Sequence, residues 1–170
     1  MGMHAYVDES KKRDYLVAAV VVPAEQVADA RRAMRELLTG HQQRIHFRDE
    51  RPSRKERVVA TVLDVSVDCR VYVSRSRHSA RENCLNRLVP DLTDSGVERL
   101  VLETDTSTEQ LDRRTLYAAT RKAGSNMIYV HHSPHQEPLL WAPDAIAWCW
   151  AAGGKWRRLI RPQVREIEAG

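Results

Sequence analysis

The residues of this sequence that are best suited to chemistry are acids at the ends of apolar segments. Asp8 ends an alternating, strand-like segment, and Glu103 follows Leu100-Val101-Leu102, with Asp105 two positions further on. Side chains alternate along a strand, so Tyr6 and Asp8 should share one face of the first strand. For the same reason, Glu103 and Asp105 should lie on the same face of the later strand as each other. Asp144 opens an apolar helical segment, whose burial would place its carboxylate against the edge of the sheet.

Carboxylates that converge in this way repel one another unless a cation neutralises them. Hard divalent ions with oxygen ligands, Mg²⁺ or Mn²⁺, are therefore the expected cofactors. Two such ions about 4 Å apart can activate a water and stabilise the leaving oxygen of a phosphoryl displacement. The residues alone leave another interpretation open, in which Asp144 caps its helix and the other acids are solvated charges at strand ends.

The pattern of the chain predicts one α/β domain spanning residues 1–170, in which strands and helices alternate. Strands are expected at 4–10, 15–22, 44–48, 69–74, 99–103 and 127–131, the first two forming an antiparallel hairpin. Helices are expected at 24–38, 53–65, 79–92, 108–122 and 143–152. Ser53 should cap the second helix, with Glu56 completing a capping box. The tail after Gly154 is expected to form a short strand or helix.

Composition restricts the class of protein further. Hydrophobic residues make up 42% and charged residues 29%, a balance typical of ordered globular chains. The longest apolar run, 15–23, is too short to span a bilayer, and residues 1–10 lack the features of a signal peptide, so a cytoplasmic protein without a membrane partner is expected. Three widely spaced cysteines predict buried free thiols and no zinc ribbon.

The distribution of basic residues indicates an anionic partner more clearly than the net charge of +4 does. Segment 70–81 carries four arginines and no acid. Arg54, Lys55, Arg75 and Arg77 are predicted to contact the backbone of a nucleic acid, with salt-dependent binding as the signature. The alternative is a solvated helix face. The sequence leaves a homo-oligomer open.

Four segments, in their order and spacing, resemble a widespread group of bacterial proteins of unknown function to which the ribonuclease-H-like fold is assigned. The segments are Tyr6-Val7-Asp8-Glu9-Ser10, the apolar strand 16–22, the pair His46-Phe47, and the run 139–145 that contains Asp144. The first of them matches the Asp-Glu-Ser-Gly strand of that group. Lys11 stands where the group usually has glycine, and Pro143 where it usually has alanine.

This resemblance implies a ribonuclease-H-like mixed sheet of five strands, led by an antiparallel hairpin and covered by helices on both faces. It also implies a metal site built from Asp8, Glu103 and Asp144, with Glu9 and Asp105 as the next candidate ligands. His46 is a candidate catalytic residue, because an imidazole can pass a proton to the leaving oxygen. A histidine hydrogen-bonded to the backbone is the alternative.

The resulting hypothesis is a metal-dependent nuclease or a related phosphodiester-processing enzyme that acts on RNA, DNA or a hybrid. The competing hypothesis is a non-catalytic ribonuclease-H-like module that binds nucleic acid or a partner protein, which the departures at Lys11 and Pro143 favour. A small phosphorylated substrate would require a glycine-rich phosphate loop, for which only Gly153-Gly154 is a candidate.

Overall fold

The computed structural model of the protein describes residues 2–170, and these form a six-stranded mixed sheet in the order β5-β4-β1-β2-β3-β6. The strands are β1 (Met3–Ser10), β2 (Tyr15–Pro23), β3 (Asp68–Ser74), β4 (Val97–Glu103), β5 (Ile128–His132) and β6 (Val164–Glu168). β1 and β2 form the predicted antiparallel hairpin, in register from Met3 opposite Pro23 to Ser10 opposite Leu16. β4 is parallel to β1, and β5 is parallel to β4, so the carboxyl ends of these three strands lie at one edge of the sheet.

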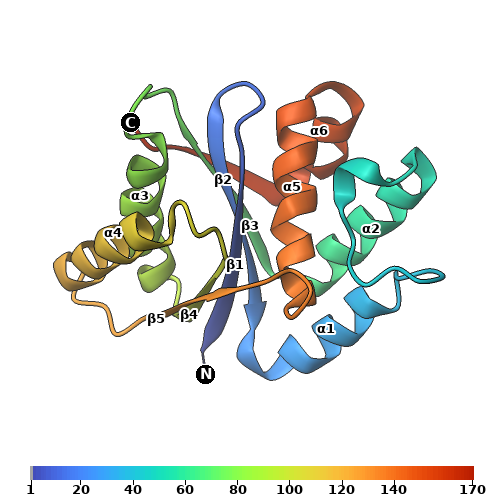
Figure 1. The fold of residues 1–170 in the computed structure, drawn as a ribbon, viewed down its shortest axis with the longest axis horizontal. Coiled ribbons are helices and arrows are strands. Elements are labelled where there is room, and N and C mark those ends of the chain that lie inside the picture. The colour runs from blue at the N-terminus through green and yellow to red at the C-terminus, as the bar shows by residue number, and fades with distance from the viewer. Residues whose placement is uncertain (1) are drawn as a thin grey trace.

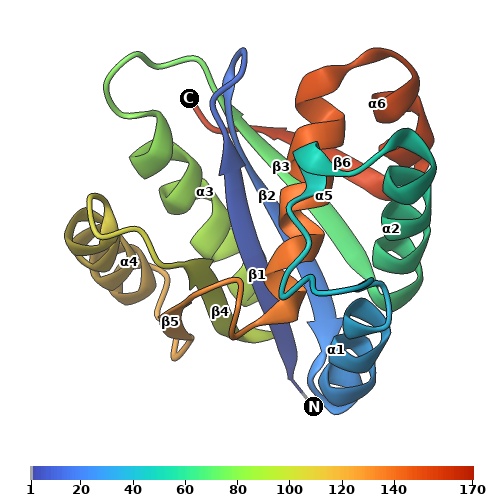
Figure 2. The same ribbon diagram turned by 45° about the vertical axis from the view of Figure 1, so that its right-hand side comes forward.

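Helices cover both faces of the sheet, as predicted (Figures 1 and 2). One face carries α1 (Val27–Arg35), α2 (Pro52–Val65), α5 (Trp141–Ala152) and α6 (Gly154–Ile160), and the other carries α3 (Ala80–Asp94) and α4 (Glu109–Lys122). Figure 2 shows α5 running along the sheet in front of β1 and β2. We call these two faces the α5 face and the α3/α4 face.

The side chains of β2 illustrate why the two layers form. Leu16, Ala18 and Val20 are buried in the core of the α5 face, whereas Val17 and Ala19 are buried in the core of the α3/α4 face. A strand with helices on both faces needs apolar residues at every position, which explains the unbroken run in the sequence. The burial of apolar surface in each core stabilises the folded chain by about 25 cal/mol for each Å² removed from water.

Three local predictions were wrong. Residues 44–48 form no strand; they lead into a 3₁₀ helix, Phe47–Asp49, because buried Phe47 packs edge-on against Trp148 of α5, with ring centroids 5.4 Å apart. The resemblance implied five strands, but β6 adds a sixth by pairing in parallel with β3; the tail, where a short strand or helix was expected, forms both α6 and β6. Helix α2 begins at Pro52 after Arg51 and has no side-chain cap, since the fixed φ of proline suits the first helical position.

Two predictions from composition have structural counterparts. The thiols of Cys69, Cys84 and Cys149 are free and buried, as expected. Among residues 2–170, no helix has the length and apolar character needed to cross a membrane.

Candidate functional site

Asp8 lies near the carboxyl end of β1 and, two residues after buried Tyr6, belongs to the α5 face. Its Oδ1 accepts a hydrogen bond from the Glu9 N–H at 2.7 Å. Burial raises the pKa of Asp8 well above its ordinary value, and the negative charges of Asp144 and Glu103 raise it further. The structure therefore brings these three predicted residues within electrostatic range of one another.

Glu103 is the last residue of β4 and lies half-buried on the same face, two residues after Val101. The parallel register pairs Val7 with Leu102, so Asp8 and Glu103 follow side by side on neighbouring strands. On its other side, Glu103 is paired with His132 of β5. The predicted convergence of acids at adjacent strand ends thus follows directly from strand order.

Asp144 is contributed by the first turn of α5. It does not cap this helix, which begins at Trp141; instead, its Oδ2 accepts a hydrogen bond from the Phe47 N–H at 3.1 Å. Burial raises the pKa of Asp144, and this effect outweighs the Phe47 hydrogen bond and the positive charge of His46, which both lower it. The 44–48 segment therefore holds the Asp144 carboxylate in place.

These carboxylates are not arranged as a finished ligand set. Among residues 2–170, no three histidine, cysteine, aspartate or glutamate side chains are placed so that they could hold a metal ion. Asp8 nevertheless experiences the charge of both partner acids. The three carboxylates therefore repel one another without being gathered into one ligand set.

Glu9 follows Asp8 but belongs to the α3/α4 face, on which Val7 is buried. Its Oε2 accepts hydrogen bonds from the Tyr15 hydroxyl and, at 2.7 Å, from Nη1 of Arg81. Lys11 approaches its other oxygen at 3.4 Å. Three partners on this face therefore hold the Glu9 carboxylate.

Arg81 extends this network into α4. Its Nε and Nη2 donate to the two carboxylate oxygens of Asp112 at 2.6 and 2.7 Å, and His131 lies 3.4 Å from the same group. Burial alone would raise the pKa of Asp112, but the hydrogen bonds from Arg81 and His131 lower it below its ordinary value. Sequence reasoning did not predict Tyr15, Asp112 or His131 as members of a site, because their contacts join five separate elements.

A cavity of about 400 Å³ lies where the two faces meet at the strand ends. Its polar lining comprises Asp8, Glu9, Arg81, Glu103, Thr104, Asp105 and Thr106. Asp105 lies beyond β4 in a turn, where it accepts hydrogen bonds from the backbone N–H and hydroxyl of Ser107, and these lower its pKa. The cavity thus gathers four of the five predicted metal ligands, and Asp144 reaches Asp8 from the α5 face.

The predicted basic residues have different surroundings. Lys55 is buried, and its ammonium group donates to the carbonyl oxygens of Arg48, at 3.0 Å, and Glu50. Arg54 donates to the carbonyl oxygen of Leu37 at 2.7 Å. Both side chains therefore hold the connection between α1 and α2, which contains Phe47.

The other three predicted residues are accessible to solvent. Arg75 and Arg77 are exposed after β3, and Arg75 lies 3.8 Å from Asp14. His46 is exposed beside Asp144, whose pKa its charge lowers. Contact of Arg75 and Arg77 with a nucleic acid and the catalytic role of His46 stay predictions.

Solved structures share this architecture. The chain is similar to ribonuclease H2 from Pyrococcus horikoshii OT3, with a TM-score of 0.60 and 15% identity, over 94% of this chain and 74% of that one. It is also similar to ribonuclease HII from Archaeoglobus fulgidus, solved in a complex with PCNA, with a TM-score of 0.58 and 18% identity, over 94% and 77% of the two chains. The fold is therefore ribonuclease-H-like, as predicted.

At these identities the likeness concerns the fold alone. No family model matches the sequence, and no curated protein matches it either. Membership of the bacterial group with the Asp-Glu-Ser-Gly strand stays a prediction.

Proposed function

We propose that this protein is a metal-dependent nuclease in which Asp8, Glu103 and Asp144 hold Mg²⁺ or Mn²⁺. The observation that carries the proposal is the placement of Asp8 and Glu103 side by side at the ends of neighbouring strands, with Asp144 near enough for its charge to raise the pKa of Asp8. Placing three acids where they destabilise one another is costly for folding, and a bound cation would repay this cost. Functional sites commonly retain such unfavourable groups.

The donor set fits the proposed metal. Mg²⁺ and Mn²⁺ prefer oxygen ligands, and all three side chains are carboxylates. When bound, such an ion supplies charge stabilisation to a phosphoryl group and lowers the pKa of a water. Glu9 and Asp105, which line the same cavity, are the further candidate ligands.

The chain's own residues have separate tasks in this proposal. The Phe47 N–H orients Asp144 by its hydrogen bond. Arg81 and Tyr15 hold Glu9 beside the proposed site. His46, exposed next to Asp144, would deliver a proton to the leaving oxygen.

The class of substrate is a nucleic acid. The similar solved structures are named ribonucleases, and the strand order of this chain places Asp8 and Glu103 at adjacent strand ends. The exposed side chains of Arg75 and Arg77 would contact the phosphate backbone.

The test is cleavage of labelled RNA, DNA and RNA–DNA hybrid by the purified protein, with Mg²⁺, with Mn²⁺ and with a chelator. We expect metal-dependent cleavage that Asp8→Asn reduces to background, because the amide is a neutral and weaker ligand. Asp94→Asn is the matched control, since Asp94 is exposed at the end of α3. Cleavage by Asp8→Asn at the wild-type rate would refute the assignment.

The second candidate function is a non-catalytic module that binds nucleic acid or a partner protein. It is favoured by the absence, within residues 2–170, of three side chains already placed to hold a metal ion. Calorimetric titration with Mn²⁺ separates the two functions. Saturable binding that is lost in Asp8→Asn and Asp144→Asn supports the nuclease; no binding, or binding that these changes leave intact, supports the module.

A further inference from the structure

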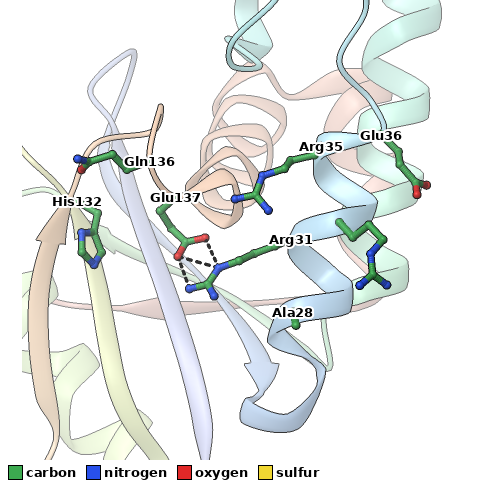
Figure 3. Close-up of a pocket in the computed structure, with 8 residues that line it drawn as sticks. Ala28, Arg31, Arg35, Glu36, His132, Gln136 and Glu137 are labelled. Carbon is green, nitrogen blue, oxygen red and sulfur yellow. Dashed lines mark hydrogen bonds and ion pairs between the residues drawn. The ribbon is translucent and has the colours of Figure 1, made fainter.

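A second and larger cavity, of about 840 Å³, opens on the α5 face between α1 and the segment that follows β5 (Figure 3). Its polar lining consists of Arg31, Arg32, Arg35, Glu36, His132, Gln136 and Glu137. Neither the predicted metal ligands nor the predicted nucleic-acid contacts belong to it. It is therefore distinct from the cavity at the strand ends.

Two of its arginines already form ion pairs within the protein. Arg31 donates from Nε and Nη2 to the carboxylate of Glu137, at 3.1 and 2.6 Å, and Glu137 also accepts a hydrogen bond from the Leu139 N–H. The Glu137 side chain is only 5% exposed, so this pair forms a fixed wall of the cavity. Arg32 pairs with Asp29 of its own helix at 3.0 Å.

Arg35 is different. Among residues 2–170 it forms no ion pair, and its side chain is exposed. Figure 3 shows its guanidinium group extending from α1 into the cavity, whereas Glu36 points away from it. Of the arginines in residues 2–170 that line the cavity, Arg35 is thus the one without an ion pair, and His132 and Gln136 lie on the opposite side as further polar groups.

The cavity lies beside the proposed metal ligands. His132, which lines it, is the β5 partner of Glu103, and neighbouring strands are about 4.8 Å apart. Glu137 precedes the 3₁₀ helix Pro138–Leu140, which leads directly into α5 and Asp144. A ligand bound to Arg35 would thus extend toward the acids at the strand ends.

We propose that this cavity binds a phosphate group of a nucleic-acid backbone, with Arg35 as the principal cation and His132 and Gln136 as hydrogen-bonding groups. The inference rests on the proposed nuclease function and adds the place where the substrate strand is held. A guanidinium fork matches a phosphate in shape and charge. Such a contact would offset the repulsion between a polyanion and the neighbouring carboxylates.

The test is fluorescence anisotropy with a fluorescein-labelled RNA–DNA hybrid and the full chain, in the presence of a chelator so that binding is measured without cleavage. Arg35→Ala should weaken binding about tenfold, since a hydrogen bond to a charged group contributes about 1.5 kcal/mol or more. It should also reduce the slope of log K against log salt concentration by about 0.9. Arg35→Lys should keep the wild-type salt slope, because it keeps the charge, but should lose part of the affinity, because an ammonium group lacks the guanidinium fork.

The matched control is Arg87→Ala, which removes one positive charge from α3 on the other face of the sheet. Equal affinities of Arg35→Ala and Arg87→Ala for the hybrid would overturn the proposal, as would a wild-type protein that does not bind the hybrid. A third outcome would also overturn the proposal: inorganic phosphate binds in a way that depends on Arg35, while Arg35→Ala leaves hybrid binding unchanged. The cavity would then be a site for a small anion.

The binding assay and the cleavage assay test the phosphate site and the nuclease function separately. Arg35-dependent binding without cleavage would support the phosphate site and refute the nuclease. Metal-dependent cleavage with binding unaffected by Arg35→Ala would support the nuclease and refute the phosphate site.

Discussion

Replacing Arg81 by alanine should destabilise the protein, because one guanidinium group joins two carboxylates from different elements. Nη1 donates to Glu9 at 2.7 Å, while Nε and Nη2 donate to Asp112 at 2.6 and 2.7 Å. The Asp112 side chain is 1% exposed, and that of Arg81 is 19% exposed. Arg81→Ala would leave the Asp112 carboxylate buried with only His131 beside it.

The magnitude follows from this burial. Removing one partner of a buried ion pair costs about 3–5 kcal/mol. Arg81 and Glu9 keep some contact with solvent, so we expect the lower end, about 3 kcal/mol. For a chain of this size, each loss of about 1 kcal/mol in the free energy of unfolding lowers Tm by about 2–4 °C, so Arg81→Ala should lower Tm by about 6–12 °C.

The assay is urea unfolding of a double-mutant cycle, followed by tryptophan fluorescence. Asp112→Asn removes the charge that Arg81→Ala leaves unpaired, so the double variant should lose less stability than the sum of the single changes, with a coupling of about 1.5 kcal/mol. The pKa of Asp112 is lowered in the folded state despite its burial. The coupling should therefore persist above the ordinary carboxyl pKa of about 3.9 and be lost as pH falls through the lowered value.

The control cycle uses Arg87 and Asp91, which pair at 3.0 Å one turn apart on α3. The Arg87 side chain is 51% exposed, so this coupling should be only about 0.3–0.5 kcal/mol. A coupling between Arg81 and Asp112 no larger than that of the control would refute the reasoning.

The acids should also make the stability of the metal-free protein depend on pH. Burial raises the folded-state pKa values of Asp8 and Asp144, so their contribution is fully present below about 3.9 and is lost as pH rises through the raised values. In a chelator at neutral pH, Asp144→Asn should therefore unfold at a higher temperature than the wild type, and an equal or lower Tm would contradict this. Mn²⁺ at about 100 times its Kd should stabilise the wild type by about 2.7 kcal/mol. Met34→Ala should cost about 2–5 kcal/mol in urea unfolding, because the side chain of Met34, in α1, is fully buried in the core; a loss below about 1 kcal/mol would show that α1 does not pack as described.

Local patterns in the sequence determined most of the elements. The apolar run of β2 and the polar residues after Ser10 predicted the hairpin, because a strand buried on both faces has to be apolar throughout. Asp8 and Glu103 were recognised as site candidates for a similar reason: each ends an apolar strand, and a carboxylate in that position is a local feature.

Contacts between residues far apart in the chain were decided only by the tertiary structure. No local pattern indicated that β6 would pair with β3, or that the 44–48 segment would pack on α5, since both depend on which edges and faces the other elements leave open. Arg81 belonged to a basic segment in the sequence, yet folding places it between Glu9 and Asp112. The charge at a position can be read from the sequence, but the partner that neutralises this charge depends on the fold. For the same reason, Arg35 stood out only once its neighbours Arg31 and Arg32 were known to be paired with other groups.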